Sequence, residues 1–219
     1  HLEMLGSIEN VARAKEELLE LVEIAVIPEH ARELEPFVPP GLDVRRFGEP
    51  RLEMRAGRAV VDGIEFSFAA RHQAANAAAA LATLDALGYA RPEGPVEVEF
   101  SRLRSQELEL PGGGLLINDS WNANPVAMRA ALAHLEERAN GRRTVAILGD
   151  MAELGPDGPR FHEEIGRAAG TVALVIGVGP LARGYDPDAW ALTAAEAAEL
   201  ARELVQPGDV VLVKGSRSV

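Results

Sequence analysis

The chain has 219 residues, 47% of them hydrophobic and 26% charged, which is the composition of a globular protein with one large or two small cores. The absence of cysteine excludes disulfide bonds and thiolate metal sites, and no apolar run is long enough to span a membrane. The formal net charge of −12 argues against nonspecific binding to nucleic acid or membranes, so an anionic ligand would need locally placed cations or Mg²⁺.

The first predicted helix begins after Ser7, a favourable N-cap, and has apolar residues at spacings of three and four: Ile8, Val11, Leu18 and Val22. Lys15 lies within this stripe, where a charged amine is costly unless it is paired or neutral. Lys15 and Lys214 are the only lysines among 22 basic residues, which favours a role that arginine cannot fill. Two interpretations stay open. Lys15 extends its ammonium to solvent at the edge of the stripe, or it is a neutral amine that reacts with CO₂ to give a carbamate able to bind Mg²⁺.

Strands are predicted next, over residues 23–27 and then over 44–68, where the pattern favours short antiparallel strands with turns at 48–50, 56–57 and 62–63. An alanine-rich helix follows over residues 71–87. It is expected to end at Gly88, because glycine readily adopts the left-handed conformation that closes a helix.

His72 and Asn76 are the polar residues of interest on this helix. They are four positions apart and therefore share one face. They form either a capping and packing pair or part of a ligand site.

A second domain is predicted to begin near Ser101, because strands and helices alternate from there on. The predicted strands are 115–117, 144–148, 172–176, 190–192 and 210–213, and the predicted helices are 126–139, 161–169 and 194–204. This order predicts the α/β class, with a Rossmann-like, doubly wound domain built on a mainly parallel sheet.

A polar cluster follows the apolar run at 115–117: Asn118, Asp119, Ser120, Asn122 and Asn124. Pro125 fits the first turn of a helix with Asn124 as its N-cap. The cluster therefore lies at the carboxyl end of a strand, where open α/β sheets bind ligands. A turn rich in capping residues is the alternative, but so many side-chain hydrogen-bonding groups exceed what capping requires.

Two further strand ends carry polar groups at the same edge of the predicted sheet. Asp150 follows the strand at 144–148 and is either an N-cap carboxylate or a partner for an ammonium group. Lys214 ends the last predicted strand, and the backbone amides around Gly215, with Ser216 and Arg217, can hold a carboxylate.

Two other features have simpler interpretations. His162 lies at a helix start, which favours a structural role. The run 177–182 fits a dinucleotide-binding fingerprint, but it is not in the first strand–helix–strand unit and Pro180 leaves little helix. Dehydrogenase function is therefore disfavoured.

Three stretches together resemble the Mur ligase family: Asn-Asp-Ser-Trp-Asn-Ala-Asn-Pro at 118–125, Leu-Gly-Asp-Met-Ala-Glu-Leu-Gly at 148–155 and Leu-Val-Lys-Gly-Ser-Arg-Ser at 212–218. The resemblance is to the members that add D-alanyl-D-alanine to UDP-N-acetylmuramoyl-tripeptide. It implies that residues 1–100 are the C-terminal part of the central, P-loop ATPase domain and that residues 101–219 are the C-terminal Rossmann-like domain. The chain has no Gly-x-x-x-x-Gly-Lys-Ser/Thr run, so we expect the P-loop and the N-terminal domain to lie upstream and this chain alone to be inactive.

The resemblance also implies roles for residues on the ATP side. His1 and a carbamylated Lys15 would hold Mg²⁺, and Lys15 and Arg102 would be the catalytic groups. His72 and Asn76 would lie near the nucleotide base. Asp119 would bind the ribose hydroxyls, which suits a fixed carboxylate acceptor, and Arg102 would contact a phosphate of ATP.

On the dipeptide side, the implied substrate-binding residues are Asn122, Asn124, Asp150, Lys214, Ser216 and Arg217. Asp150 would take the ammonium group of D-alanyl-D-alanine. Trp121 stands where the family usually has tyrosine, so the hydroxyl is lost.

The expected function is therefore ATP-dependent amide ligation through an acyl phosphate, in peptidoglycan precursor synthesis. The expected protein is a cytoplasmic monomer, without nucleic-acid binding or membrane insertion. A noncatalytic module that binds nucleotide or peptide is the alternative from another class. A folylpolyglutamate-type ligase is the alternative enzyme, and the stretches at 118–125 and 212–218 argue against it.

Overall fold

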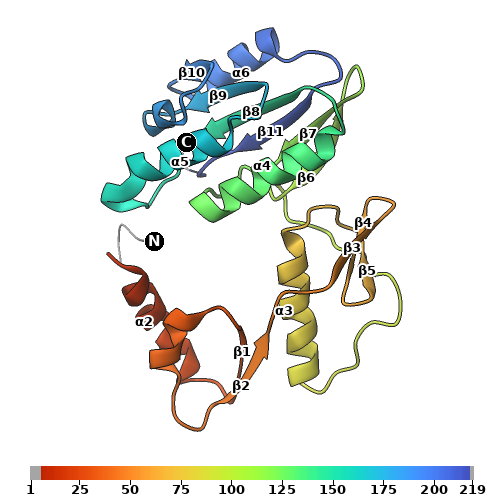
Figure 1. The fold of residues 1–219 in the computed structure, drawn as a ribbon, viewed down its shortest axis with the longest axis vertical. Helices are drawn as coiled ribbons and strands as arrows, with labels where there is room; N and C mark the ends of the chain where they lie inside the picture. Colours follow the sequence, from red (N-terminus) through yellow and green to blue (C-terminus); the bar gives the residue numbers. More distant parts are fainter. Residues whose placement is uncertain (1–5, 218–219) are drawn as a thin grey trace. The chain divides into compact units, whose positions relative to one another are not determined.

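The structure is a computed structural model that describes residues 6–217. The chain divides into two compact units, His1–Glu99 and Phe100–Val219 (Figure 1). Within residues 6–217, no helix is both long enough and apolar enough to cross a membrane.

The first helix of the amino-terminal unit is α2 (Ile8–Leu19), whose N-cap is Ser7 as predicted: Asn10 N–H donates to Ser7 Oγ at 3.1 Å. The predicted buried stripe is wrong. Ile8 and Leu18 are 61% and 66% exposed, and the buried residues of the helix are Ala12 and Leu19. Because these two are seven positions apart, they define a different face from the predicted one, and Lys15 is exposed.

The first two strands correct the expected strand pairing. The strand β1 (Ile24–Pro28) pairs in parallel with β2 (Asp43–Phe47), which we expected to be antiparallel to its successors. A parallel pair needs a crossover, and the 3₁₀ turn η1 (Arg32–Phe37) lies within it. The hairpin rules used for residues 44–68 therefore do not apply to the first of these strands.

The next three strands form an antiparallel sheet as predicted: β3 (Leu52–Arg55), β4 (Arg58–Val61) and β5 (Ile64–Phe66). Both turns were predicted correctly. Ala56 and Gly57 have φ values of +49° and +81°, and Asp62 and Gly63 have +48° and +86°. Two consecutive left-handed residues define the type I′ turn, whose twist matches that of the adjoining strands.

The alanine-rich helix α3 (Gln73–Ala86) agrees with prediction and is followed by Gly88 at φ +74°. Its buried residues are small except for one leucine: Ala74, Ala77, Ala78 and Leu81. Small side chains on this face allow the helix to approach its neighbours closely.

The carboxy-terminal unit contains a six-stranded sheet in the order β10-β9-β8-β11-β7-β6. The strands are β6 (Gln106–Leu110), β7 (Gly114–Asn118), β8 (Thr144–Gly149), β9 (Leu174–Val178), β10 (Ala189–Ala191) and β11 (Val210–Lys214). Every pairing is parallel except that of β6 with β7. The predicted α/β fold with a mainly parallel sheet is confirmed, and only the edge strand β6 was missed.

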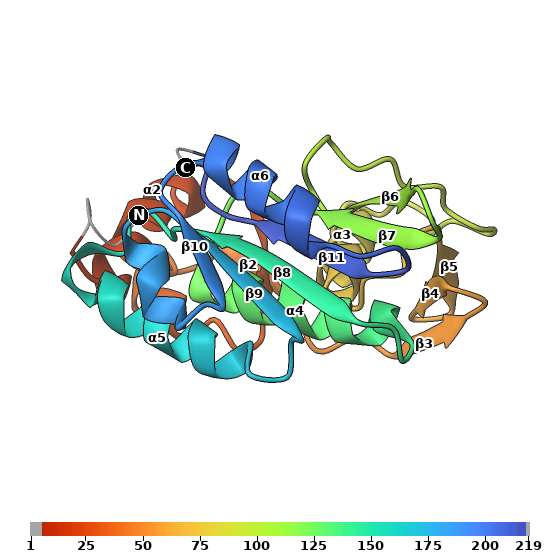
Figure 2. The ribbon, with the colours of Figure 1, turned by 90° about the horizontal axis from the view of Figure 1, so that it is seen from above.

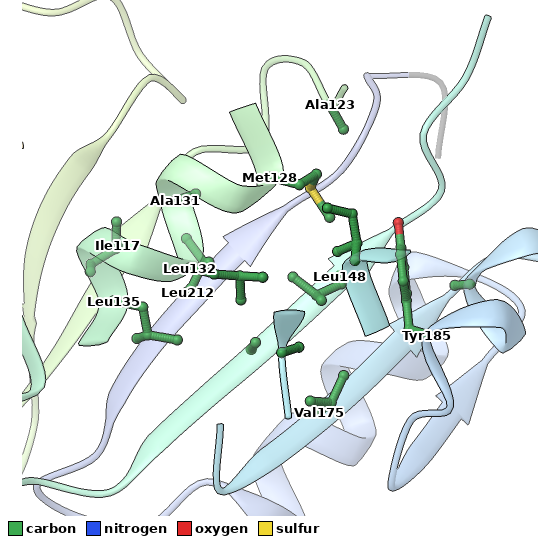
Figure 3. Packing of buried hydrophobic residues seen from close by; sticks show 14 of the residues in the cluster. Ile117, Ala123, Met128, Ala131, Leu132, Leu135, Leu148, Val175, Tyr185 and Leu212 are labelled. Carbon is green, nitrogen blue, oxygen red and sulfur yellow. The ribbon is translucent and has the colours of Figure 1, made fainter. Parts of the chain in front are cut away.

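Helices cover both faces of this sheet, as a doubly wound domain requires. The helices α4 (Pro125–Ala139) and α5 (Gly158–Ala168) lie on one face, and α6 (Ala194–Leu204) lies on the other (Figure 2). Alternation along β11 matches this arrangement, since Leu212 joins the α4 side of the core and Val211 the α6 side. Figure 3 shows Leu212 beside Ile117, Leu132 and Leu135 in the core under α4.

The edge strand β6 is fastened to α4 by Glu107. Its carboxylate accepts hydrogen bonds from Arg138 Nε and a second guanidinium nitrogen of Arg138 at 2.8 and 2.7 Å, and it lies 3.2 Å from His134 Nε2. Burial by itself raises the pKa of Glu107, but the hydrogen bonds from His134 and Arg138 and the charge of Arg138 outweigh it and hold the pKa at about 2. The ordinary pKa of this carboxyl is 4.5.

Glu107→Gln is expected to destabilise this unit by about 1.5 kcal/mol at pH 7, the lower end of the range for hydrogen bonds to a charged group, because the Glu107–Arg138 pair is partly exposed. A carboxylate with a lowered folded-state pKa stabilises the fold above its unfolded pKa, so the contribution is complete above about pH 4.5 and is lost as the pH falls towards about 2. Urea unfolding at pH 7 and pH 3, followed by tryptophan emission, measures it, because both tryptophans lie in this unit.

Glu109→Gln is the matched control, since Glu109 is exposed on the same strand. The two variants should differ fully at pH 7 and by a smaller amount at pH 3, because pH 3 lies between the unfolded pKa of 4.5 and the folded pKa of about 2. Equal unfolding midpoints for both variants at pH 7 would contradict the assigned role of Glu107.

Candidate functional site

Three neighbouring parallel strands end at one edge of the sheet. The strand β7 ends at Asn118, β8 at Gly149 and β11 at Lys214, and β11 lies between the other two. Parallel strands share their carboxyl edge, so the polar residues that follow them are brought together as the sequence predicted. A groove of about 940 Å³ opens at this edge and continues along the α6 face of the sheet, with Ser120, Gly149 and Arg217 among its lining residues.

The loop from β7 into α4 is built from the predicted caps. Asn124 has the extended conformation of an N-cap, and its Oδ1 accepts a hydrogen bond from Ala127 N–H at 2.9 Å, with Pro125 in the first turn. Asn118 Oδ1 accepts a hydrogen bond from Ser120 Oγ at 2.8 Å. Part of the polar cluster therefore shapes the turn. This was the simpler of the two interpretations for those residues.

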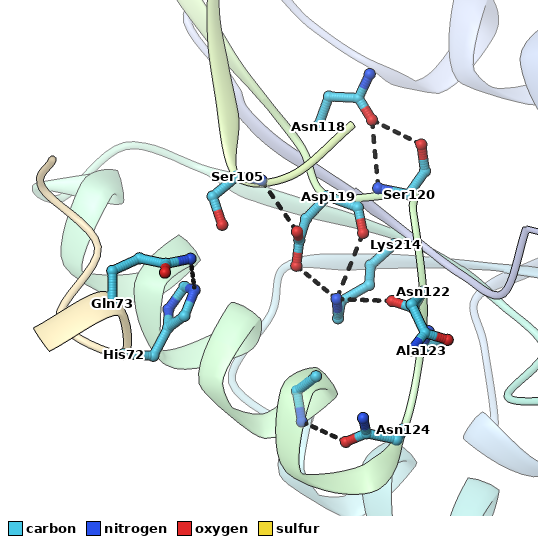
Figure 4. A network of polar contacts seen from close by, with 11 residues as sticks. His72, Gln73, Ser105, Asn118, Asp119, Ser120, Asn122, Ala123, Asn124 and Lys214 are labelled. Atoms are coloured by element: carbon cyan, nitrogen blue, oxygen red, sulfur yellow. Dashed lines mark hydrogen bonds and ion pairs between the residues drawn. The ribbon is translucent and has the colours of Figure 1, made fainter. Parts of the chain in front are cut away.

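Lys214 and Asp119 form a buried ion pair at the centre of the site (Figure 4). Lys214 is 3% exposed, and its Nζ lies 2.5 Å from Asp119 Oδ2. The same ammonium donates to the carbonyl oxygen of Asn122 at 3.0 Å. Ser105 N–H donates to Asp119 Oδ1 at 3.0 Å. Lys214, at the end of β11, thus holds the loop after β7 through the side chain of Asp119 and the backbone of Asn122.

This pairing bears on the expected ligand roles of both residues. In this structure the Lys214 ammonium bonds to the 119–122 loop. Its role here is therefore to fix the conformation of that loop. Each oxygen of Asp119 accepts one protein hydrogen bond, and a carboxylate oxygen has a second lone pair for a ligand hydroxyl. Binding of ribose by Asp119 stays a prediction.

Asp150 is 7% exposed and is committed to the loop after β9. Its Oδ1 accepts a hydrogen bond from Ala182 N–H at 2.7 Å, at the start of the 3₁₀ turn η3 (Leu181–Tyr185). Gly179 has φ +102°, and a Cβ added there would lie 2.6 Å from Asp150 Cγ. The carboxylate therefore caps a distant turn, and Gly179 of the dinucleotide-like run makes room for it.

Ser216 and Gly215 join β11 to the loop after β8. Ser216 N–H donates to Asp150 O at 3.0 Å, and Ala152 N–H donates to Ser216 Oγ at 2.8 Å. A Cβ on Gly215 would lie 2.9 Å from Gly149 Cα, so only glycine allows the two strands to end this close. Ser216 is buried, and both its hydroxyl and its amide take part in this junction.

His162 has the structural role that its position suggests. It is fully buried, and its Nε2 accepts a hydrogen bond from Met151 N–H at 3.0 Å. Nδ1, which lies 2.7 Å from Gly158 O, must therefore carry the proton and donate it. This fixes a neutral tautomer and secures the loop after β8 to α5.

Tyr185 was not predicted, because a single tyrosine in a loop carries no sequence signal. Its hydroxyl donates to Gly149 O at 2.8 Å, beneath the end of β8. Burial raises the pKa of Tyr185, and the nearby charge of Asp150 raises it further. The phenol therefore stays protonated and acts as a donor.

Arg104 and Arg217 are exposed cations at this edge of the sheet, and Arg102, two positions before Arg104, is exposed as well. The guanidinium carbons of Arg104 and Arg217 lie 5.3 and 4.8 Å from the centre of the Trp121 ring. Arg104 was missed by sequence reasoning, although it follows Arg102 by two positions and is the fourth residue of Ser-Arg-Leu-Arg.

In the amino-terminal unit, Gln73 links the two predicted base-side residues. Its Nε2 lies 3.1 Å from His72 Nε2, and its Oε1 accepts a hydrogen bond from Asn76 Nδ2 at 2.7 Å. His72 occupies the N-cap position of α3 without a side-chain capping bond. The pair is therefore joined through Gln73, and a contact with a nucleotide base stays a prediction.

The described residues do not by themselves compose the expected Mg²⁺ site. His1 lies outside residues 6–217, and Lys15 is exposed on α2. Within residues 6–217, no three His, Asp or Glu side chains gather where they could hold a metal ion.

Comparison with known proteins gives a family match to the unit that contains these strand ends. The family described as "Mur ligase, glutamate ligase domain" matches residues 103–217. The UDP-N-acetylmuramoyl-tripeptide–D-alanyl-D-alanine ligase of Mycobacterium leprae (strain TN) is 35% identical over 199 residues, which cover 77% of this chain and 38% of that protein. The enzyme of the same name from Escherichia coli (strain K12) is 36% identical over 118 residues, covering 50% of this chain and 25% of that protein.

Among solved structures, the MurF ligase from Thermotoga maritima in complex with ADP matches with a TM-score of 0.82 and 25% sequence identity. The match covers 100% of this chain and 56% of that one. The chain thus spans about two fifths of the first curated relative. Because the family matches more than half of the chain and includes all three strand ends of the site, the chain belongs to the Mur ligase family.

Proposed function

We propose that this chain forms part of an ATP-dependent ligase that joins D-alanyl-D-alanine to UDP-N-acetylmuramoyl-tripeptide in peptidoglycan precursor synthesis. The relatives at 35% and 36% identity carry the name of that enzyme. The observation that carries the proposal is the ordered carboxyl edge of the sheet, where Lys214 and Asp119 fix the 119–122 loop beside the groove.

The reaction would have two steps. A carboxylate oxygen of the tripeptide attacks the γ-phosphorus of ATP, which gives an acyl phosphate and ADP. The free amine of D-alanyl-D-alanine then attacks the acyl carbon, an amide bond forms, and phosphate and a proton leave. Fixed cations near the transferred phosphoryl group stabilise its charge, which is the main contribution proteins make to phosphoryl transfer.

The expected site residues fall into two groups, those exposed to a ligand and those whose side chains bond to other parts of the chain. Arg102 is exposed and suits a phosphate of ATP, and Asp119 has acceptor capacity for the ribose hydroxyls. Asn122, Asn124 and Arg217 are exposed and available to the dipeptide. Asp150, Lys214 and Ser216 support the loops from within.

The proposal also covers the nucleotide base, the metal ion and the state of the enzyme in the cell. His72 and Asn76 would lie near the base of ATP. Mg²⁺, held by His1 and a carbamylated Lys15, would supply charge neutralisation for the phosphates. The protein would act as a cytoplasmic monomer.

The test is an ADP-release assay on the natural polypeptide that carries this sequence, purified at its full length. Continuous ADP release should require ATP, UDP-N-acetylmuramoyl-tripeptide and D-alanyl-D-alanine together, because each new turnover needs the dipeptide amine to consume the acyl phosphate. Arg102→Gln should lower kcat/KM for ATP by about 10- to 100-fold, since one charge-assisted contact is lost from the transition state. Arg167→Gln, an exposed arginine at the end of α5, is the matched control and should leave the rate unchanged.

Glutamate in place of the dipeptide separates the alternatives, because the matched family is described by glutamate ligation. ADP release with D-glutamate or L-glutamate but not with D-alanyl-D-alanine would overturn the proposed substrate. No ADP release with any acceptor would favour a noncatalytic binding module.

A further inference from the structure

Two arginines from distant segments, Arg104 and Arg217, contact the ring of Trp121. Arg104 comes from the segment before β6, Trp121 from the loop after β7, and Arg217 from the segment after β11. Contact with an aromatic face restricts the conformations of an otherwise mobile, exposed arginine. Both guanidinium groups are therefore held near one ring before any ligand binds.

The backbone is strained at the residues on both sides of Arg104. Leu103 and Ser105 have φ values of +67° and +48°, in the left-handed region that residues other than glycine seldom adopt. Two hydrogen bonds fix the segment: Trp121 N–H donates to Leu103 O at 3.1 Å, and Ser105 N–H donates to Asp119 Oδ1 at 3.0 Å. Strain of this kind is found where a structure must hold a functional group in place.

The positive charges of Arg104 and Arg217 are also unusual, because in this acidic protein they have no carboxylate partner among the described residues. Within residues 6–217 neither Arg104 nor Arg217 forms an ion pair, whereas Arg138 and Arg143 of the same unit pair with carboxylates. The charge of Lys214, by contrast, is neutralised by Asp119. Two unpaired guanidinium groups on one ring repel each other, and an anion placed between or beside them relieves that repulsion.

We propose that Arg104, Trp121 and Arg217 form an oxyanion clamp, which binds a phosphoryl or carboxylate group of a substrate at the mouth of the groove. Leu103, Ser120 and Arg217 line that groove, so a ligand in it would meet the clamp. The proposal rests on the proposed function only for the source of the anion, a phosphate chain or a peptide carboxylate. It makes Arg104 and Trp121 binding determinants in addition to Arg217.

The indole N–H signals in nitrogen–proton NMR spectra of the 219-residue chain provide the test. There are two tryptophans, and Trp190 is a built-in control because Arg183 lies over it at 3.7 Å. Pyrophosphate and D-alanyl-D-alanine are titrated separately. The Trp121 signal should shift with saturation for at least one probe, the Trp190 signal should not, and added salt should weaken binding.

Arg104→Gln should raise the Kd of the binding probe at least tenfold, as expected when one charge-assisted contact is lost. Arg183→Gln, which removes the same charge from the other arginine–tryptophan pair, should change the Kd less than twofold. Unchanged far-UV circular dichroism and urea midpoints show that the Arg104→Gln variant is folded. Tighter binding of pyrophosphate assigns the clamp to the phosphate chain, and tighter binding of the dipeptide assigns it to the carboxylate.

The clamp is overturned if neither probe moves the Trp121 signal, or if Arg104→Gln binds as tightly as the unchanged chain. Failure of the proposed function is a separate result. Pyrophosphate binding that depends on Arg104, in a protein that releases no ADP with any acceptor, would retain the clamp and reject the ligase.

Discussion

Lys214→Met is expected to destabilise the carboxy-terminal unit by about 3 to 5 kcal/mol, the usual cost of removing one partner of a buried ion pair. Lys214 is 3% exposed, and methionine fills most of its volume without the charge. The Asp119 carboxylate would then be left without its cation, and the carbonyl of Asn122 without its donor. Urea unfolding followed by tryptophan emission measures the effect in this unit, which contains both tryptophans.

Lys15→Met is the matched control, because Lys15 is the other lysine of the chain and is exposed. It should change the free energy of unfolding by less than about 0.5 kcal/mol. Adding Asp119→Asn to Lys214→Met should recover part of the loss, since the uncompensated charge disappears. Equal midpoints for the two lysine variants would show that the ion pair does not stabilise the site.

Gly166→Ala is expected to cost about 3 kcal/mol, at the upper end of the range for overpacking. A Cβ at this position of α5 would lie 2.5 Å from Tyr185 O and 2.7 Å from Tyr185 C. Both are backbone atoms, so no side-chain rotation relieves the clash and α5 must move away from η3. The hydrogen bond from the Tyr185 hydroxyl to Gly149 O is then also disturbed, so the effect extends to the end of β8.

Gly158→Ala at the start of the same helix is the comparison. The nearest atoms to a Cβ there are 3.8 and 3.9 Å away, which is ordinary contact. Alanine also favours a helix over glycine by up to about 1 kcal/mol. Gly158→Ala should therefore keep or raise the urea midpoint. A Gly166→Ala variant as stable as Gly158→Ala would contradict the close packing of α5 on η3.

The sequence predicted the positions of strands well where a strand is apolar and is followed by residues typical of turns or helix caps. The apolar run before Asn118 and the Asn124–Pro125 cap located β7 and α4 correctly. The strand β6 was missed because its sequence, Gln-Glu-Leu-Glu-Leu, does not read as a buried strand. Glu107 turns towards α4 and pairs with Arg138, while Leu108 is 42% exposed. On the side of β6 that faces α4, the ion pair of Glu107 with Arg138 thus stands where a buried strand would usually have an apolar residue.

The sequence predicted that the three polar strand ends lie at one edge of the sheet, but it did not predict the contacts among their side chains. Strand order brings the three motifs together, and this could be inferred from the α/β alternation. The pairing of Lys214 with Asp119 joins residues 95 positions apart, and periodicity carries no information about such contacts. The predicted stripe around Lys15 was wrong, since it included the exposed residues Ile8 and Leu18 and left out Leu19, which is buried.

The position of β11 has a consequence for the order in which this domain can form. The last strand of the described sheet in sequence lies between β7 and β8, and it pairs with both. During synthesis, the centre of the sheet therefore stays incomplete until residues 210–214 have left the ribosome, with two apolar strand edges open to other chains. Contacts over such long stretches of sequence also slow folding. We expect nascent forms that stop short of β11 to depend on chaperones and to aggregate without them.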